Sequence, residues 1–292
     1  MKDVQRIKVA EIPIDIEMGD SQFFNDRFSE YLAAEDGPAQ MRISARTVES
    51  FTPPKGEEIL KIRRTTVLAL EDGRRCHYQY DTKREQYFQM CLYRPDFSES
   101  EITLAEFLHG DNLSAAECEH AYIAFDFASR LGYLGGAVLH GSAIAYKGRG
   151  VIFSAPSGTG KSTHTGLWKQ CFGEDVVHVN DDKPALRFDG DTIYMYGTPW
   201  SGKTDLNTNV RVPLHAVVFV QRGEQNSMRR LELTESIYYL QSQVIQPYHD
   251  AQIGSDLIDR MIQVATSVPV YLLTCNMDPE AAHVAREALF GE

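Results

Sequence analysis

A glycine-rich turn between an apolar strand and a predicted helix carries the residues best suited to chemistry. Residues 150–163 read Gly-Val-Ile-Phe-Ser-Ala-Pro-Ser-Gly-Thr-Gly-Lys-Ser-Thr, close to the Walker A pattern of a phosphate-binding loop (P-loop). In such a loop the backbone N–H groups form an anion-binding nest, and the next helix directs its positive end at the same phosphates. The residues expected to bind ATP are Ser157, Gly158, Thr159, Gly160, Lys161, Ser162 and Thr163.

Two side chains of this loop have roles of their own. Lys161 is expected to reach the β- and γ-phosphates, and the hydroxyl of Ser162 to bind Mg²⁺. Ala155 stands where the Walker A pattern has its first glycine, but a strand before the loop and a helix after it supply the context that the motif needs. The alternative is a surface turn that binds nothing, and Gly-Lys-Ser-Thr at a strand-to-helix junction argues against it.

Adjacent carboxylates follow the next apolar run. Residues 176–179 predict a short strand, and Asn180, Asp181, Asp182 and Lys183 come directly after it. Ligands of open α/β sheets bind at the carboxyl ends of strands, so a strand neighbouring the P-loop would bring both aspartates close to the γ-phosphate. One carboxylate could then hold magnesium while the other accepts the proton of an attacking hydroxyl. An ordinary Asn-Asp-Asp turn is the alternative.

Two further segments could contribute to this site. Residues 135–154 predict a β-hairpin that leads into the P-loop, and its antiparallel pairing could place His140 at the nucleotide end of the sheet. A structural histidine is the alternative there. The polar, glycine-bearing segment 197–209 predicts a loop in which Trp200 and Lys203 could position an acceptor or neutralise charge on the transferred group. A surface loop with a packed tryptophan is equally compatible.

Taken in order, the strand with His140-Gly141, the loop Ser157–Ser162 and the pair Asp181-Asp182 form a combined pattern. With it, residues 137–275 resemble the catalytic domain of HPr kinase/phosphorylase, in the phosphoenolpyruvate-carboxykinase-like branch of P-loop proteins. The resemblance implies a Mg²⁺-dependent kinase that transfers the γ-phosphoryl group of ATP to a hydroxyl, usually that of a serine. It also implies that Asp181 is the catalytic base, that Lys161 and His140 lie in the catalytic site, and that the protein is a homo-oligomer.

The sequence departs from that family at several points. The strand 192–200 has no carboxylate after Asp191, so Ser162 and Asp182 become the expected metal ligands. No segment matches the C-terminal part linked to phosphate removal, and the N-terminal region shows no match. The acceptor therefore stays open between a serine of a protein or peptide and a small hydroxylated metabolite such as an amino acid. Two functions of different classes also fit the motifs, namely a nucleotide-binding regulator with slow ATPase activity and a P-loop scaffold without catalysis.

Composition restricts the class of protein. The chain has 292 residues, of which 43% are hydrophobic and 24% charged, and its net charge is −12. An acidic surface argues against non-specific binding of nucleic acid or membranes. The five cysteines show no C-x-x-C spacing, and no apolar run has signal-peptide or membrane-span length. These features predict a cytoplasmic enzyme.

The expected fold is α+β or α/β, with three parts. Residues 1–112 alternate polar and apolar side chains, which predicts a mostly antiparallel β region with a short helix at 23–32. Residues 113–136 predict a bridging helix, begun by a capping box of Ser114 and Glu117. Residues 137–292 form the expected P-loop catalytic domain, with later strands at 214–220 and 268–274 and helices at 234–244, 255–265 and 279–289.

Overall fold

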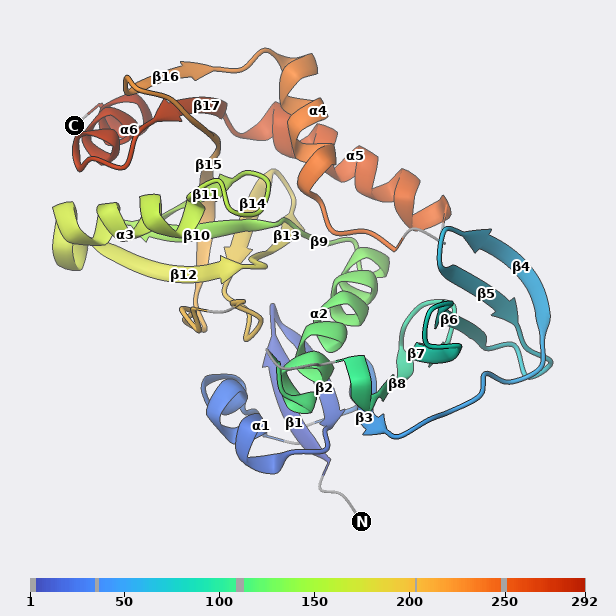
Figure 1. Cartoon of the computed structure of the whole chain (residues 1–292). Helices are drawn as coiled ribbons and strands as arrows, with labels where there is room; N and C mark the ends of the chain where they lie inside the picture. Colours follow the sequence, from blue (N-terminus) through green and yellow to red (C-terminus); the bar gives the residue numbers. More distant parts are fainter. Residues whose placement is uncertain (1–3, 35–36, 109–112, 203, 248–250, 292) are drawn as a thin grey trace. The chain divides into compact units, whose positions relative to one another are not determined.

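The computed structural model describes residues 4–34, 37–108, 113–202, 204–247 and 251–291. It has a mixed α/β architecture with two β-sheets, and the chain divides into two compact units (Figure 1). Unit 1 comprises Met1–Tyr133 and Pro247–Ala251, and unit 2 comprises Leu134–Gln246 and Gln252–Glu292. Among the described residues, no helix is both long and apolar enough to cross a membrane.

Unit 1 is built on a sheet with the strand order β1-β2-β3-β8-β7-β6-β5-β4. Most neighbouring strands are antiparallel, as the alternating sequence predicts, but β2–β3 and β3–β8 are parallel. The strands are β1 (Gln5–Val9), β2 (Ile12–Glu17), β3 (Met41–Val48), β4 (Glu57–Ile62), β5 (Thr65–Ala69), β6 (Arg75–Asp81), β7 (Gln86–Tyr93) and β8 (Glu99–Ala105).

One long helix covers part of this sheet. α2 (Ala115–Tyr133) packs against β3 and β8 and belongs to unit 1. Its start confirms the predicted capping box, because Ser114 N–H donates to Glu117 Oε2 at 2.7 Å and Glu117 N–H donates to Ser114 Oγ at 3.1 Å. The shorter helices of the unit are α1 (Ser21–Phe28), η1 (Ser29–Tyr31) and η2 (Glu106–Leu108).

Unit 2 contains the P-loop sequence and a second sheet. Its main strand order is β12-β10-β11-β15-β14-β13-β9, and β17 pairs with β15 and β16. The strands are β9 (Ala137–Val138), β10 (Gly141–Tyr146), β11 (Arg149–Ser154), β12 (Val176–Asp182), β13 (Ala185–Asp189), β14 (Thr192–Tyr196), β15 (Arg211–Arg222), β16 (Ser227–Arg230) and β17 (Val270–Cys275).

Helices lie on both faces of this second sheet. α3 and α6 share a core with alternate residues of β10, β11 and β15, among them Phe153 and Val218. On the other face, the ring of Phe219 lies 4.9 Å from that of Tyr239 in α4. The helices are α3 (Lys161–Phe172), η3 (Gly173–Asp175), α4 (Leu233–Gln243), α5 (Ala251–Ser267) and α6 (Glu280–Phe290).

Strand β12 differs from its prediction. The apolar run predicts a strand that ends at residue 179, whereas β12 continues through Asp182. The reason is pairing: β10 is hydrogen-bonded to β12 as far as the partners Ser142–Asp181 and Gly141–Asp182. The two carboxylates therefore belong to a strand with a fixed register rather than to a free turn.

The interior of unit 1 contains a carboxylic acid. Asp126 of α2 is 5% exposed, and the thiol of Cys91 in β7 donates to its Oδ2 at 3.3 Å. Burial raises the pKa of Asp126 to about 6, and the hydrogen bond offsets only part of that effect. An unfolded aspartate titrates near 3.9, so the unfolded state loses this proton at a lower pH than the folded state does.

Replacing Asp126 with asparagine should therefore stabilise unit 1 at high pH. A folded pKa above the unfolded one means that stability is present at low pH and is lost as the pH rises through 6. The gain in the free energy of unfolding for Asp126→Asn should be larger near pH 8 than near pH 5 by about 1 kcal/mol. Chemical denaturation at both pH values tests this, with exposed Asp26→Asn as the control. An equal effect at both values would contradict it.

Candidate active site

Three strands of unit 2 bring the predicted site residues to one edge of the sheet. β10 lies between β11 and β12 and is antiparallel to both. The start of β10, next to His140, therefore lies beside the end of β11, which leads into the P-loop, and the end of β12, which carries the aspartates. β12 is thus two strands away from the P-loop strand, not directly next to it, yet its carboxyl end reaches the same edge.

The loop between β11 and α3 has the backbone of an anion-binding nest. Gly158 has φ +77° and Gly160 has φ +116°, a region that favours glycine. α3 begins at Lys161, and its cap residue Gly160 offers no side-chain acceptor. The first N–H groups of a helix have no acceptor within the helix, so those of Lys161, Ser162 and Thr163 are available to a phosphate. Ser157, Gly158 and Thr163 are exposed, and Thr159 and Gly160 are partly exposed.

Lys161 belongs to a chain of polar contacts across the sheet edge. Its Nζ lies 3.0 Å from His140 Nε2 and also donates to the carbonyl oxygen of Ala155 at 2.9 Å. The other ring nitrogen of His140, Nδ1, lies 3.1 Å from Asp182 Oδ1, and Lys183 pairs with Asp182 Oδ2. An ammonium can only donate, so this arrangement assigns the acceptor role to Nε2 and the proton to Nδ1 of His140.

The surroundings lower the pKa values of both Lys161 and Asp182, which disfavours the charged form of the lysine and favours the charged form of the aspartate. Burial lowers the pKa of Lys161, and the carboxylates of Asp182 and Asp181 oppose that shift. Burial would raise the pKa of Asp182, but hydrogen bonds from His140 and Lys183 outweigh it and lower this pKa to about 2. Asp182 is therefore an anion at neutral pH.

Asp181 makes a separate set of contacts. It is 6% exposed, and its Oδ1 accepts from the hydroxyl of Ser162 at 2.8 Å. Its Oδ2 accepts from the hydroxyl of Thr204 at 2.7 Å. The structure thus pairs Ser162 with Asp181, and His140 with Asp182. Thr204 was not among the predicted site residues, and its place in a polar loop beside Lys203 was the only available signal.

The loop after β14 is held against the end of β12. A Cβ at Gly197 would lie 1.9 Å from the carbonyl oxygen of Thr208, so only glycine allows this close approach. Asn180 donates to the carbonyl oxygen of Thr198 at 2.8 Å, and the loop then brings Thr204 to Asp181. Trp200 is 1% exposed, which favours packing over contact with an acceptor. Lys203 lies outside the described residues.

Arg222 also contributes to the site without having been predicted. It ends β15, and its Nη2 and Nε donate to the carbonyl oxygens of Gly158 at 2.6 Å and Thr159 at 3.2 Å. Arg222 thereby ties the end of β15 to the loop before α3. No sequence motif links Arg222 to the loop, because β11 and β15 become neighbours only in the folded sheet.

The oxygens at this edge suit a hard cation bound together with phosphate. Across the described part of the chain, no three histidine, cysteine or acidic side chains are grouped to hold a metal ion. Magnesium bound with nucleotides commonly uses only one or two protein oxygens, with water and phosphate as its other ligands. The hydroxyl of Ser162 and the carboxylate of Asp181 provide such a pair.

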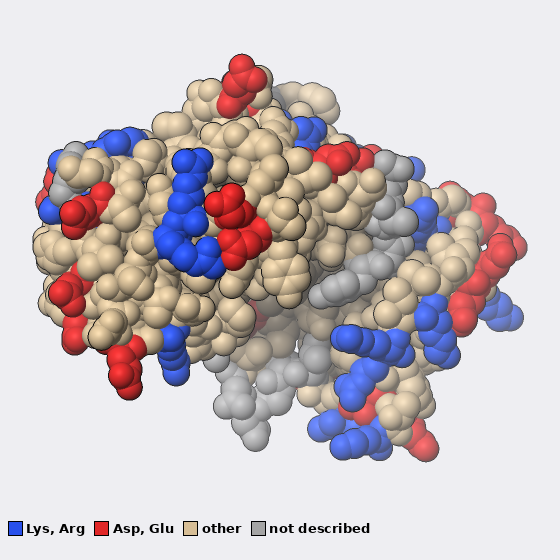
Figure 2. Space-filling model, turned by 90° about the horizontal axis from the view of Figure 1, so that it is seen from above, with Lys and Arg blue, Asp and Glu red and all other residues tan. Residues whose placement is uncertain are grey.

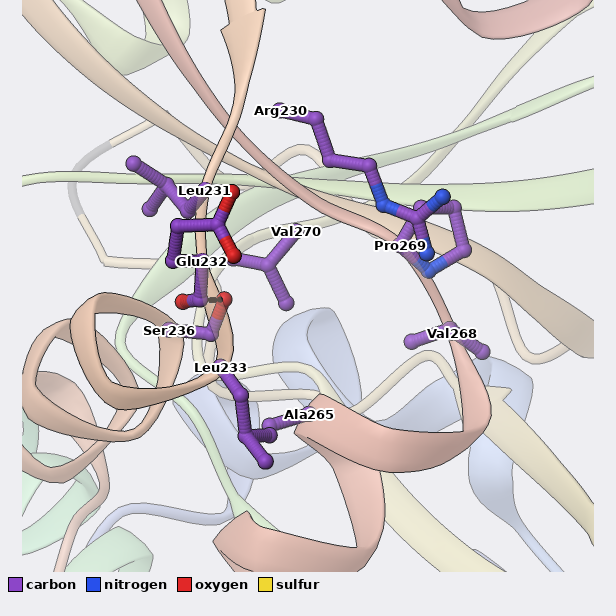
Figure 3. Close-up of a pocket in the computed structure, with 9 residues that line it drawn as sticks. All are labelled: Arg230, Leu231, Glu232, Leu233, Ser236, Ala265, Val268, Pro269 and Val270. Atoms are coloured by element: carbon purple, nitrogen blue, oxygen red, sulfur yellow. Dashed lines mark hydrogen bonds between the residues drawn. The ribbon is translucent and has the colours of Figure 1, made fainter.

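A cavity of about 360 Å³ lies elsewhere in unit 2, around the start of β17 and the first turn of α4 (Figure 3). This is the opposite edge of the sheet from the P-loop, because β17 is parallel to β15 and β11. The helix end there is already capped: Glu232 and Glu235 form a reciprocal capping box. The side chain of Glu232 thus accepts from the start of α4 and places a carboxylate in the cavity lining, which disfavours an anion there.

Comparisons with known proteins leave the family open. No family model matches the sequence, and no curated protein matches it. Among solved structures, the chain is similar to the Hpr(Ser) kinase/phosphatase from Coxiella burnetii, at 12% identity and a TM-score of 0.32. The match covers 52% of this chain and 89% of that one. A likeness at this TM-score carries no argument about activity, so the function has to follow from the site itself.

A buried histidine of α3 packs between this helix and strand β11. His164 is 1% exposed, its Nε2 accepts from Trp168 Nε1–H at 3.1 Å, and its ring lies 4.7 Å from that of Phe153. Burial lowers the pKa of His164 to about 4. An unfolded histidine titrates near 6.5, so acid protonates it in the unfolded chain first.

Mild acid should therefore destabilise unit 2 through His164. Its contribution to stability is present above pH 6.5 and is lost as the pH falls toward 4, by about 2 kcal/mol near pH 5. Chemical denaturation at both pH values tests this. Between neutral pH and pH 5, the free energy of unfolding should fall less for His164→Gln than for the wild type. His283→Gln, on the exposed side of α6, is the control and should behave like the wild type. Equal losses in all three proteins would exclude this role.

Proposed function

We propose that this chain is an ATP-dependent phosphotransferase with a phosphoenolpyruvate-carboxykinase-like P-loop domain, acting on a hydroxyl acceptor. One observation carries the proposal: Lys161 and Ser162, adjacent on α3, contact His140, just before β10, and Asp181 of β12, at one edge of the sheet. Phosphoryl transfer needs a phosphate cradle, a cation site and a proton acceptor within a few ångströms of each other. These contacts supply candidates for all three.

The cradle is the segment Ser157–Thr163. Gly158 and Gly160 give it two left-handed turns, as expected of a phosphate-binding loop, and the positive end of α3 would add to the attraction for phosphate. Lys161 donates to neutral acceptors, the carbonyl oxygen of Ala155 and the ring of His140. Phosphate oxygens are stronger acceptors for an ammonium, so we expect Lys161 to move from these partners to the β- and γ-phosphates.

The cation site in this proposal consists of Ser162 and Asp181. Adjacent ligands of octahedral Mg²⁺ lie about 2.9 Å apart when the metal–oxygen bonds are 2.0–2.1 Å. The observed separation of Ser162 Oγ and Asp181 Oδ1, 2.8 Å, fits that spacing. Bound Mg²⁺ would neutralise charge on the transferred phosphoryl group. This assignment differs from the predicted pair of Ser162 and Asp182, because Asp182 is engaged by His140 and Lys183.

The proton acceptor in this proposal is His140. Asp182 holds the Nδ1–H of His140, which leaves Nε2 as the basic atom, as in other histidine bases oriented by a carboxylate. When the side chain of Lys161 turns from His140 to the phosphates, Nε2 of His140 becomes free to accept the proton of the attacking hydroxyl. Asp181 was the base predicted from the family resemblance, but its two oxygens already accept from Ser162 and Thr204. Asp182, with a pKa of about 2, is a weak base but a strong orienting anion.

The proposal also includes the phosphoryl acceptor, the oligomeric state and the cellular compartment. The acceptor is a serine of a protein or peptide, or a small hydroxylated metabolite, and the assembly is a homo-oligomer. We place the reaction in the cytoplasm, because all five cysteines of the chain are free thiols. A nucleotide-dependent regulator with slow ATPase activity is the main competing function. Both functions need the P-loop, and they differ in whether the phosphoryl group reaches an acceptor other than water.

Transfer of labelled γ-phosphate from ATP-Mg²⁺ into cell extract, separated by size, tests the activity. Wild-type protein should label either macromolecules or small molecules, and Lys161→Ala should label neither, because it removes the cation that contacts the phosphates. Lys169→Ala, also on α3 but away from the loop, is the matched control and should retain transfer. Release of inorganic phosphate alone would favour the regulator over the kinase.

The proposed cation ligand and the proposed base should give different kinetic defects. Asp181→Asn should raise the Mg²⁺ concentration needed for half-maximal transfer, because it weakens a cation ligand. His140→Gln should lower kcat by about 10²- to 10⁴-fold, while ATP binding is retained. Titration of Mg²⁺ and measurement of kcat and ATP affinity for both variants separate the roles. An unchanged Mg²⁺ requirement in Asp181→Asn, together with loss of transfer, would return the base to Asp181.

A further inference from the structure

A second candidate binding surface lies in unit 1, on the sheet end that contains β4 and β5. A groove of about 620 Å³ opens there between strands β4, β5, β6 and β7. Its lining residues are Leu60, Ile62, Arg63, Arg64, Thr65, Val67, Gln79 and Phe88. We refer to these residues as the β4–β5 groove. All of them belong to unit 1, so the groove is separate from the P-loop site.

The apolar floor of the groove is only partly covered. The helix α2 packs against β3 and β8, in the middle of the strand order, whereas β4 and β5 lie at its far end. On β4, Ile62 remains 42% exposed. An exposed apolar side chain in a concave site is a typical anchor point for a partner.

The charged residues that line the groove are both positive. Arg63 and Arg64 are exposed, and no acidic side chain is among the lining residues described. This contrasts with a net charge of −12 for the whole chain. In Figure 2, several Lys and Arg side chains lie close together in one region of the face shown, with Asp and Glu side chains among them. Neither arginine is within ion-pair distance of a described carboxylate, although Arg64 is near enough to Asp81 at the end of β6 to help lower the pKa of that carboxyl.

The turn that carries the arginines is conformationally strained. Ile62 pairs with Thr65, so the connection between β4 and β5 has only two residues. Arg63 adopts φ +53°, a left-handed conformation that is unfavourable for a residue with a Cβ. Glycine or asparagine is the usual choice at such a position. Two arginines here place adjacent positive charges at the rim, at a cost in local stability.

We propose that the β4–β5 groove binds an acidic, apolar-containing segment of a polypeptide partner. Carboxylates of that segment would pair with Arg63 and Arg64, and its apolar side chains would contact Leu60, Ile62 and Phe88. The floor is mainly aliphatic, which suits side chains better than stacked bases. Binding in the groove is favoured over addition of a strand to β4, because a register shift between Glu58 and Leu60 disrupts that edge.

The test uses the full chain and a short fluorescein-labelled peptide of alternating glutamate and leucine, measured by fluorescence anisotropy. Wild-type protein should bind it, and added salt should weaken binding. Arg63→Gly and Arg64→Gln should each weaken binding about fivefold, the value of one ion pair at the rim. Since glycine relieves the strain at φ +53°, Arg63→Gly should melt at or above the wild-type temperature, which separates lost binding from misfolding.

Lys147→Gly is the matched control. It also removes one cation from a hairpin turn at positive φ, 48°, but in unit 2, and it should bind the peptide as the wild type does. Peptides with glutamine for glutamate, or serine for leucine, should bind more weakly than the probe. Equal binding by the arginine variants, or preference for single-stranded RNA or anionic vesicles over the peptide, would overturn the proposal. The readout is binding, so a failed phosphoryl-transfer assay leaves this result unaffected.

Discussion

The pairing of β10 with both β11 and β12 is the constraint on which the site depends. Because β10 is antiparallel to each neighbour, its start lies beside two strand ends, and His140, the P-loop and the aspartates share one edge. Backbone hydrogen bonds fix this register, with Ser142 opposite both Phe153 and Asp181. A slip by one residue would turn Asp181 to the other face of the sheet and separate it from Ser162.

The polar and charged side chains at this edge of the sheet form two separate groups of contacts. One consists of Lys161, His140, Asp182 and Lys183, in which His140 and Lys183 contact one partly buried carboxylate and Lys161 contacts the histidine. The other consists of Ser162, Asp181 and Thr204, in which two hydroxyls serve one carboxylate. Adjacent strand residues point to opposite faces, so neighbouring aspartates acquire different partners. This difference in partners supports separate roles in metal binding and in orienting a base.

The two units present contrasting surfaces. In unit 2 the proposed anion-binding element is the glycine-bearing loop before α3 with one buried lysine, which suits a small, highly charged phosphate. In unit 1 the cations of the β4–β5 groove are exposed arginines beside an apolar floor, which suits a larger ligand with dispersed carboxylates. A P-loop site and a polypeptide-binding groove on separate units would let one chain combine chemistry with partner selection.

Much of the local structure could be predicted from the sequence, because it depends on near neighbours. Alternation predicted the β strands, the Ser114–Glu117 capping box predicted the start of α2, and Gly158 and Gly160 predicted the loop before α3. Contacts between distant segments could not be predicted in this way. Tertiary pairing extended β12 to Asp182, brought Thr204 to Asp181 and Arg222 to the P-loop, and left the β4–β5 groove uncovered. Residue types determined which chemistry is available, whereas strand register, which depends on long-range hydrogen bonds, decided which side chain meets which.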